Sequence, residues 1–586
     1  MTHSMERLPE WDAKALIPNE KTLHSRMEDI RKQTKKFQAH RKDIEHPTRS
    51  MIEQIMDENE WFARESTVLS SHAMLAFSRD TNDEKAKARE SHIEQFLTKE
   101  SNARLFFGLW WKELEEKKAK SLLPRNTEHA YALTEMRKYK RHMLSEKEEQ
   151  LSNLKSVTGN GALVKLYDII TNAYTYEWKT GTKKHTLNEE ELRSRIRSPK
   201  PEERERAYAL LWGQYEKDEG TLGEIYRNIS MDGWNEDISL RKYKSPLSIR
   251  NMANDLSDTT VETFLESCRE NTGVFQSHFA WKANELGHPL AREHIYAPIH
   301  PTKERWGFQS GYKTVMKAYG KFSPRMREEA HKVMAQNRMD APLRKGKRSG
   351  AFCAGVLPEE TSYVLLNWTG TAESVSTLAH ELGHAIHNHL SSHHSLFTQH
   401  AGLPLAETAS TFGEMLLDEH LLEQNTNPAL RKRILSKQLD DACAGIQRQA
   451  YFTLFEKKAF EMVKEGKTIP EISQTYMENL RQQFGKKMTI PPVARHEWLG
   501  IPHFFHVPFY TYAYAFGHLL VLNFYARYQK EGKDFVQDYE RFLAYGGSKG
   551  PEAMLDEMGF DSRKKRSWDR GFRLLETKQK ELAHME

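Results

Sequence analysis

The residues His380-Glu-Leu-Gly-His384 have the types and spacing of a metal-binding motif. On a helix, positions i and i+4 lie one turn apart on nearly the same face, so both imidazoles can reach one metal ion. Glu381 is turned by about 100° from His380. There it could accept a proton from water whose pKa a zinc ion lowers to about 7. The chain has 27 histidines, so roughly one chance match is expected in ten such chains, and the motif needs support from its surroundings.

Glu407 is the candidate third ligand. It follows His384 by 23 positions and stands at the start of a second expected helix, which could run back past the first. The alternative is an ordinary first-turn acid that the helix dipole stabilises. Glu414, two turns later on the same face, is expected to be a partner behind the ligands. The longer HExxHxxGxxH pattern fails, because His387 and Leu390 occupy its glycine and last histidine positions, so a His-His-Glu site remains.

The other histidines that follow the motif are interpreted as surface residues and not as ligands: His387, His389, His393, His394 and His400.

A second cluster lies far downstream and contains His503, Tyr510, Tyr512 and Tyr514. Hydrolysis of a carbonyl group creates an oxyanion, and Tyr hydroxyls or a His N–H aimed at that oxygen would stabilise it. The alternative is an aromatic core segment, since residues of this kind at this spacing usually pack inside a protein.

The elements around the motif are expected to position it. Residues 373–390 have the apolar periodicity of a helix, with Val375, Leu378 and Leu382 in a buried stripe. The apolar run Tyr363–Trp368 predicts a strand just before it. We interpret that strand as the sheet edge along which an extended peptide would bind by backbone hydrogen bonds. The glycine-rich segment 345–355 is not expected to be helical.

Helical periodicity covers nearly all of the chain. The exception is residues 173–187, where aromatic and polar residues alternate about Thr180-Gly181 and predict a hairpin. Helices are expected after Asn188 and around Pro201. We place a division near residue 195.

Composition limits the classes of function. The 586 residues are 38% hydrophobic and 29% charged, and the net charge is only +5, which does not indicate a nucleic-acid binder. Three scattered cysteines favour a reducing, cytoplasmic setting. No signal-peptide core or membrane span is expected.

Several segments together resemble oligoendopeptidase F, in the thimet-oligopeptidase family of zinc metallopeptidases. They are HELGHAIH followed by AETAS, the preceding GKRSGAFCAG and LLNWTGT, and the late IPHFF and FYTYAYAFG. The opening LPEWDAKALIP is also similar, so the resemblance covers most of the chain.

The resemblance implies a mainly α, large prolate helical fold with a deep substrate channel and a zincin-like catalytic core with a small β-sheet. Residues 1–195 would cover the channel, and residues 196–586 would form the catalytic domain. It further implies one zinc ion on His380, His384 and Glu407, with Glu381 as general base. His503 and the tyrosines, of which we favour Tyr510 and Tyr512, would stabilise the tetrahedral intermediate.

The sequence therefore predicts a cytoplasmic zinc endopeptidase that cleaves internal bonds of short unfolded oligopeptides, without a nucleic-acid or membrane partner. A metallocarboxypeptidase of the same fold is the alternative within the enzymes. A helical peptide-binding scaffold with a degenerate metal site is the alternative from another class.

Overall fold

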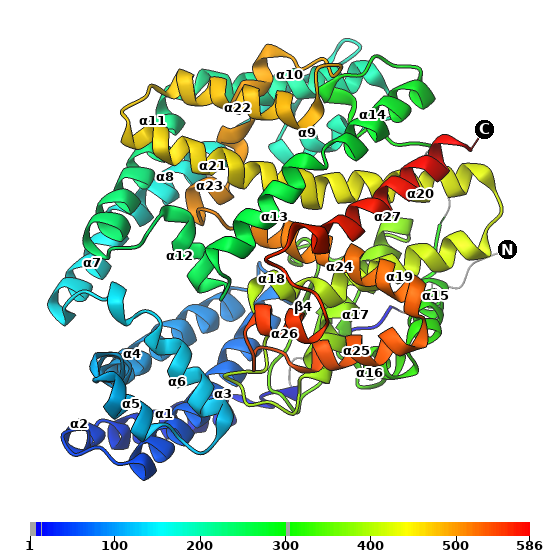
Figure 1. The fold of residues 1–586 in the computed structure, drawn as a ribbon. Helices are drawn as coiled ribbons and strands as arrows, with labels where there is room; N and C mark the ends of the chain where they lie inside the picture. The colour runs from blue at the N-terminus through cyan, green and yellow to red at the C-terminus, as the bar shows by residue number, and fades with distance from the viewer. Residues whose placement is uncertain (1–7, 13–14, 301–304, 586) are drawn as a thin grey trace. The chain divides into compact units, whose positions relative to one another are not determined.

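The computed structural model describes residues 8–12, 15–300 and 305–585, and it is mainly helical with two small sheets, as predicted (Figure 1). The chain divides into two compact units, each assembled from three segments. The first unit consists of Met1–Arg141, Glu304–Leu421 and Tyr528–Met558, and the second of His142–Lys303, Leu422–Arg527 and Gly559–Glu586. The predicted division at residue 195 falls inside the second unit and stays a prediction. None of the helices in the described ranges is long and apolar enough to cross a membrane.

The first unit contains helices and one three-stranded sheet. Its elements are α1 (Glu20–Phe37), α2 (His40–Asp43), α3 (Arg49–Arg79), α4 (Glu84–Glu113), α5 (Glu116–Leu122), α6 (Thr127–Arg137), α15 (Phe308–Phe322), α16 (Pro324–Ala335), β3 (Met339–Asp340), β4 (Phe352–Ala354), β5 (Tyr363–Leu365), α17 (Ala372–Leu390), α18 (Leu403–Ala406), the start of α19 (Thr408–Gln424), α25 (Lys533–Ala544) and α26 (Pro551–Glu557).

The second unit is helical apart from one hairpin. Its elements are α7 (Glu146–Thr158), α8 (Asn160–Asn172), β1 (Tyr176–Thr180), β2 (Lys183–Leu187), α9 (Glu189–Ile196), α10 (Pro201–Lys217), α11 (Glu219–Gly233), the π-helix η3 (Trp234–Leu240), α12 (Pro246–Ala253), α13 (Asp258–Glu270), α14 (Gly273–Leu286), η4 (Arg292–His294), α20 (Pro428–Ala442), the π-helix η5 (Cys443–Gln447), α21 (Arg448–Lys464), α22 (Ile469–Phe484), η6 (Pro492–Gly500), α23 (His503–His506), most of α24 (Tyr512–Glu531) and α27 (Lys565–Ala583). The short 3₁₀ turn η2 (Lys140–His142) lies at the boundary of the units.

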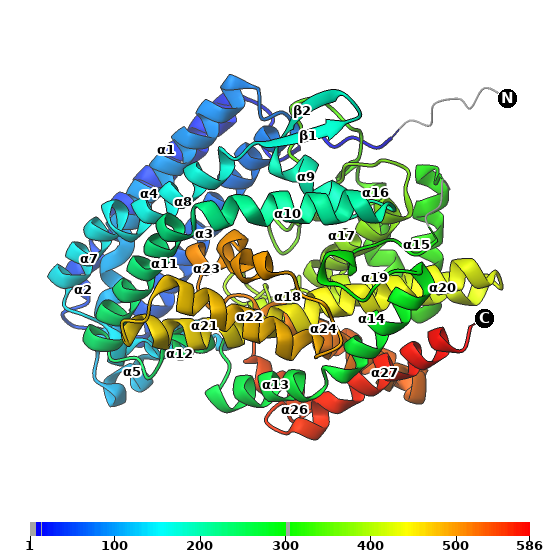
Figure 2. The same cartoon turned by 90° about the horizontal axis from the view of Figure 1, so that it is seen from above.

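The predicted hairpin is confirmed. β1 and β2 pair antiparallel about Gly181, whose φ of 59° is a left-handed conformation that glycine adopts without strain. Asn188 caps α9 through a capping box, and Pro201 occupies the first turn of α10, as expected from the sequence. The hairpin and these two helices are labelled together in Figure 2.

The sheet of the first unit corrects one prediction. Its strand order is β3-β5-β4, with β3 parallel and β4 antiparallel to β5, so the segment Tyr363–Leu365 is the central strand and not the edge. All three residues of β5 are fully buried. A continuous apolar run of this kind marks a strand covered on both faces. β4, within the glycine-rich segment, lies at one edge.

Helix α17 begins at Thr371, whose side chain accepts a hydrogen bond from the backbone N–H of Ser374. The predicted stripe is buried, and it packs against α15, α16, β4 and β5 in the first unit. The sheet in turn shares a core with the N-terminal helices, in which Trp11, Leu69 and Tyr363 belong to one cluster. The helix that carries the motif therefore packs on a sheet that is itself fixed by the N-terminal helices.

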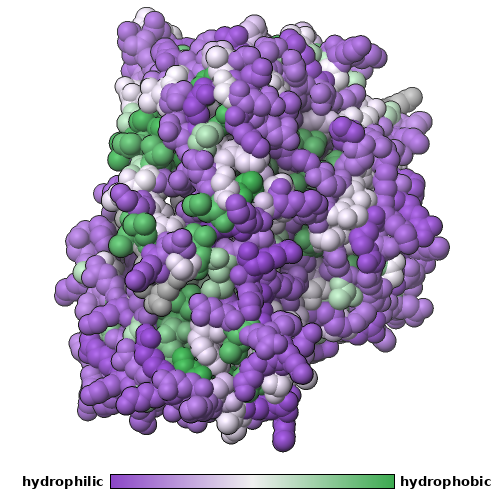
Figure 3. All heavy atoms as spheres, turned by 60° about the vertical axis from the view of Figure 1, so that its left-hand side comes forward, coloured by the Kyte–Doolittle hydropathy of each residue, from purple (hydrophilic) through white to green (hydrophobic). Residues whose placement is uncertain are grey.

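Hydrophobic side chains reach the surface on the face drawn in Figure 3. In the second unit, four of the large exposed ones have helical spacing on α7 and α8: Leu151, Leu154, Leu166 and Ile169. They are 48–73% exposed, so each of these two helices turns an apolar edge outward.

Candidate active site

His380, His384 and Glu407 converge, as the motif predicts. The Nε2 atoms of His380 and His384 lie 3.3 and 3.4 Å from Oε2 of Glu407. A tetrahedral zinc ion with N and O ligands at about 2.0–2.1 Å would place its ligands about 3.3–3.4 Å apart, so this donor set fits zinc. Within the described part of the chain, it is the single group of three or more His, Cys, Asp or Glu side chains that could hold a metal ion.

Two glycines let α17 and α19 approach closely enough to form this cluster. A Cβ atom on Gly383 would lie 2.5 Å from both the carbonyl oxygen of Ala409 and Cα of Ser410. A Cβ on Gly413 would meet the carbonyl oxygen of Ala379 at 3.1 Å and the Tyr319 hydroxyl. The backbones are thus in contact, and Glu407, at the junction of α18 and α19, comes within reach of both histidines.

Polar partners behind the ligands hold them in place. Nδ1 of His380 lies 2.7 Å from Oε1 of Glu414, which confirms the predicted place of Glu414. The Ser376 hydroxyl donates to the other oxygen of Glu414 at 2.8 Å, and the Ser410 hydroxyl donates to Oε2 of Glu407 at 2.8 Å. A carboxylate on the second nitrogen of a ligating histidine orients the ring and raises its basicity.

Glu381 lies beside the cluster and is 6% exposed. Burial raises the pKa of its carboxyl, and the nearby His380 and His384 oppose that rise. Two cavities of about 440 and 420 Å³ meet at this point, because both are lined by Ala351, His380 and Glu381. The carboxylate therefore lies where two cavities adjoin beside the cluster.

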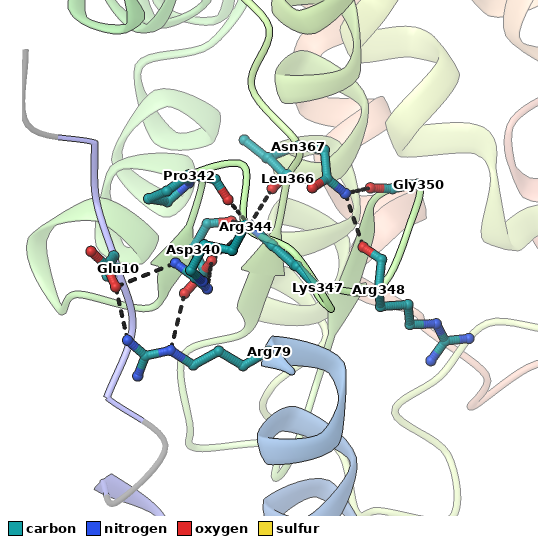
Figure 4. A network of polar contacts seen from close by, with 10 residues as sticks. All are labelled: Glu10, Arg79, Asp340, Pro342, Arg344, Lys347, Arg348, Gly350, Leu366 and Asn367. Carbon is teal, nitrogen blue, oxygen red and sulfur yellow. Dashed lines mark hydrogen bonds and ion pairs between the residues drawn. The ribbon is translucent and has the colours of Figure 1, made fainter. Parts of the chain in front are cut away.

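A buried lysine anchors the loop that leads into β4 (Figure 4). The Lys347 side chain is fully buried, and its Nζ donates to the carbonyl oxygens of Asp340, Pro342 and Leu366 at 2.6–3.1 Å. The same Nζ lies 2.7 Å from Oδ1 of Asp340. Outside this anchor, the Asn367 amide donates to the carbonyl oxygens of Arg348 and Gly350 at 2.9 and 2.8 Å.

This anchored loop forms one wall of the site. Ala351 lines both cavities and Gly350 lines one of them, and Phe352 begins the edge strand β4. From the sequence, this segment was expected only to be non-helical, and the peptide-binding edge was predicted at Tyr363–Trp368 instead. The basic residues in its glycine-rich segment were the available signal, since a lysine among glycines and beside a strand can cap carbonyl ends.

The second predicted cluster lies in the other unit. The ring of His503 stacks on Tyr510 with centroids 5.6 Å apart, and Tyr514 contacts both rings edge-on at 5.9 and 5.1 Å. Burial lowers the pKa of His503, with His506 and Arg448 adding to the effect, so a neutral ring with one N–H donor is favoured. These three rings are half-buried.

Tyr512 does not contact these rings in the same way. Its side chain is fully buried, and its hydroxyl accepts a hydrogen bond from the Asn254 amide at 2.8 Å. Burial raises the pKa of this hydroxyl. Tyr514 was disfavoured on sequence, although its spacing of four from Tyr510 matches one turn of a helix.

The interpretation of the neighbouring histidines as surface residues is wrong for three of them. His387 is 6% exposed. His389 accepts a hydrogen bond from the backbone N–H of Ser362 on Nε2, and its Nδ1 faces Glu329. His394 binds Glu128 and the carbonyl oxygen of Ala544. None of them belongs to the metal-ligand cluster of the described residues. His393 and His400 are exposed, as expected.

The sequence of this chain is similar to those of known peptidases. The sequence model of peptidase family M3 matches residues 316–574, and that of Oligopeptidase F matches residues 110–176. An oligoendopeptidase F homolog from Borreliella burgdorferi is 28% identical over an alignment of 574 positions that covers 95% of this chain and 94% of that protein. Oligopeptidase PepF from Bacillus subtilis is 25% identical over 88% of this chain and 78% of its own length.

Solved structures share the fold. A chain from Chlamydophila abortus superimposes with a TM-score of 0.88 at 21% identity, covering 98% of both chains. Oligoendopeptidase-F from Enterococcus faecium gives a TM-score of 0.72 at 17% identity, over 97% of this chain and 99% of that one. The predicted resemblance to oligoendopeptidase F is confirmed.

Proposed function

Since the chain belongs to peptidase family M3 and resembles oligoendopeptidase F, we propose that it is a zinc-dependent endopeptidase of short, unfolded oligopeptides. The observation that carries this proposal is the His380–His384–Glu407 cluster, whose 3.3 and 3.4 Å separations match the edges of a zinc tetrahedron. When bound there, zinc would polarise the scissile carbonyl and make water more acidic. Peptidase activity follows from the family; the metal and the internal-bond specificity are our proposal.

Glu381 is proposed as the general base. Its carboxylate stands where the two cavities meet, so it can accept a proton from the attacking water and deliver it to the leaving amine nitrogen. Burial raises its pKa, which brings the carboxyl nearer to the pKa that proton transfer at neutral pH requires. Glu414 and Ser376 act behind it by holding the His380 ring in one orientation.

The substrate is proposed to lie extended along β4. An edge strand has unpaired N–H and C=O groups on its outer side, and a peptide of any sequence can pair with them. Ala351 would lie beside the scissile bond, because it lines both of the cavities that Glu381 lines, and Gly350 lines one of them.

His503 and Tyr510 are proposed to donate hydrogen bonds to the developing oxyanion. Tyr514 supports this pair, since it contacts both rings. Tyr512 is the weaker donor of the two tyrosines predicted from the sequence, because its hydroxyl already binds Asn254.

The three cysteines are unpaired, which supports a reducing, cytoplasmic setting.

The test is Glu381→Gln in the zinc-loaded protein, assayed on a peptide blocked at both ends. We expect zinc content to stay at one equivalent while kcat falls by at least about 100-fold, because the amide cannot accept the proton. Glu328→Gln, an exposed acid on α16, is the matched control and should keep full activity.

The same assay separates the alternatives. Internal cuts in a peptide with both ends blocked contradict a carboxypeptidase. Zinc below roughly half an equivalent after reloading would contradict an intact three-ligand site and favour a binding scaffold. Near-normal activity of Glu381→Gln would overturn the proposed base.

A further inference from the structure

The turn that carries Tyr510 has a strained backbone. Phe509 has a φ of 58°, in the left-handed region that bulky side chains avoid. Pro508 precedes it, and the N–H of Tyr510 donates to the carbonyl oxygen of Val507 at 3.2 Å. This is the pattern of a type II turn, which normally has Gly or Asn where Phe509 stands. A strained residue persists only where its surroundings hold it.

One face of α21 holds this turn. Oε1 of Glu456 accepts a hydrogen bond from the N–H of Phe509 at 2.9 Å. One helical turn along, Phe460 packs against the Phe509 ring with centroids 5.1 Å apart. Toward the other end, the hydroxyl of Thr453 lies 3.0 Å from that of Thr511. The residues on either side of Tyr510 are thus both bound to the same helix face, and α21, α23 and α24 are labelled in Figure 2.

The hydrogen bond from Phe509 is made in a fully enclosed place. Glu456 is 0% and Phe509 2% exposed, so water cannot replace this partner. A buried N–H without an acceptor costs about 1–3 kcal/mol, and this turn leaves the N–H of its third residue outside its own hydrogen bond. Among the described residues, the second oxygen of Glu456 has no hydrogen-bond partner, so the N–H of Phe509 provides the one hydrogen bond found there for this carboxyl.

From this geometry we infer that Glu456 is a positioning residue, which holds the Val507–Tyr510 turn in its strained form and so aims the Tyr510 hydroxyl beside His503. The inference rests on the proposed function, in which Tyr510 donates to the oxyanion. Arg250 faces both groups: its charge acts on Glu456, and its guanidinium lies 6.0 Å from the Tyr510 ring.

The chemistry of Glu456 suits an acceptor more than a charge. Burial raises its pKa to about 8, while the Phe509 hydrogen bond and Arg250 oppose that rise. The carboxyl is therefore mostly protonated at pH 7, and glutamine is its closest replacement, since the amide oxygen can still accept from the N–H of Phe509. Leucine has a similar size and no acceptor.

The experiment compares Glu456→Gln and Glu456→Leu in the full-length, zinc-loaded enzyme. We expect Glu456→Leu to lower kcat by about 10- to 100-fold with zinc content and KM for a short peptide little changed, because a misplaced hydroxyl loses its effect on the transition state. Glu456→Gln should restore most of kcat. Equal losses in both variants, or no loss in Glu456→Leu, would overturn the inference.

A double-mutant cycle tests whether Glu456 acts through Tyr510. If it does, Glu456→Leu lowers kcat in the wild-type background and adds little in the Tyr510→Phe background. Additive losses would contradict it. Val463→Ala, a buried change two turns further along α21, is the matched control for general loosening of the helix and should leave kcat unchanged.

A probe that needs no activity separates failure of this inference from failure of the proposed function. With 3-fluorotyrosine at position 510, the fluorine resonance should shift or broaden in Glu456→Leu and stay in place in Glu456→Gln and Val463→Ala. An unchanged resonance in Glu456→Leu would overturn the positioning role even if the enzyme proved to cleave by another route. Should Glu456→Leu fail to fold, Glu456→Met, an unbranched side chain without a carboxyl or amide oxygen for the N–H of Phe509, takes its place and is expected to perturb the same resonance; an unperturbed one would overturn the inference.

Discussion

The metal-ligand cluster of the first unit and its partner Glu414 come from residues 380–414 on two touching helices. The rings of His503, Tyr510 and Tyr514 in the second unit, here called the Tyr510 cluster, depend instead on side chains from α12, α21, α23 and α24. In the first, His380 and Glu407 have polar partners in Glu414 and Ser410, and glycines set the approach of the helices. In the second, a strained turn is held by one carboxyl and one aromatic contact. A short-range motif thus builds the candidate metal site, and long-range packing builds the cluster around Tyr510.

Gly383→Ala is the substitution that we expect to disrupt the metal-ligand cluster most. The added methyl group would stand 2.5 Å from the backbone of α19, so the two helices must separate and carry Glu407 away from His384. We expect loss of stoichiometric zinc and of nearly all activity, measured by metal analysis and peptide hydrolysis. Gly402→Ala is the control, because its Cβ would meet only Pro404 at 4.0 Å. Full zinc binding by Gly383→Ala would show that the approach of the helices is not limiting.

The second region is tested by Tyr510→Phe against Tyr512→Phe. Removing the Tyr510 hydroxyl should lower kcat by about 100-fold, the size expected for one oxyanion donor. Removing the Tyr512 hydroxyl leaves the buried Asn254 amide without its acceptor, so it should lower the free energy of unfolding by about 1 kcal/mol and change kcat little. Steady-state kinetics and thermal melting distinguish the two. The reverse result would make Tyr512 the donor.

Glu414→Ala tests the layer behind the ligands. Without Oε1 of Glu414, His380 loses the partner that fixes its ring, and zinc affinity should fall by about 10- to 100-fold. Competition with a chelator measures this change. Glu414→Gln keeps an oxygen for Nδ1 of His380 and should lie between wild type and Glu414→Ala. An unchanged affinity would mean that the three ligands alone hold the site.

The same contrast explains what could be predicted from the sequence. His380, His384, Glu407 and Glu414 lie within 35 residues, and helical geometry alone relates them. The edge strand was misplaced because β5 has a hydrogen-bonded neighbour on each side, β3 and β4, and the two-residue strand β3 comes from a separate segment earlier in the chain. No local pattern carries that information.

Long-range packing also explains why the predictions for single side chains were wrong. His389 is buried because Glu329 and Ser362, distant in the sequence, provide its polar partners. Tyr512 is committed to Asn254, more than 250 positions away, so the order of the tyrosines in FYTYAY could not show which hydroxyl is available.

The smallest expected effect on activity comes from the residues that anchor α17 beyond the ligands. The hydrogen bond from His389 lowers the pKa of Glu329 to about 2, with burial opposing and Lys332 assisting. Its pKa in the folded protein is below that of the unfolded chain, so the stabilisation is present above about pH 4.5 and is lost as the pH falls toward 2. At pH 6, Glu329→Gln should therefore have a free energy of unfolding up to about 3 kcal/mol below that of wild type, seen as a lower melting temperature. This difference in stability should narrow at pH 4 and below. Because neither side chain belongs to the metal-ligand cluster, kcat at pH 7 should be unchanged; a matching loss of kcat would mean that the anchor at the end of α17 also sets the geometry of His380 and His384.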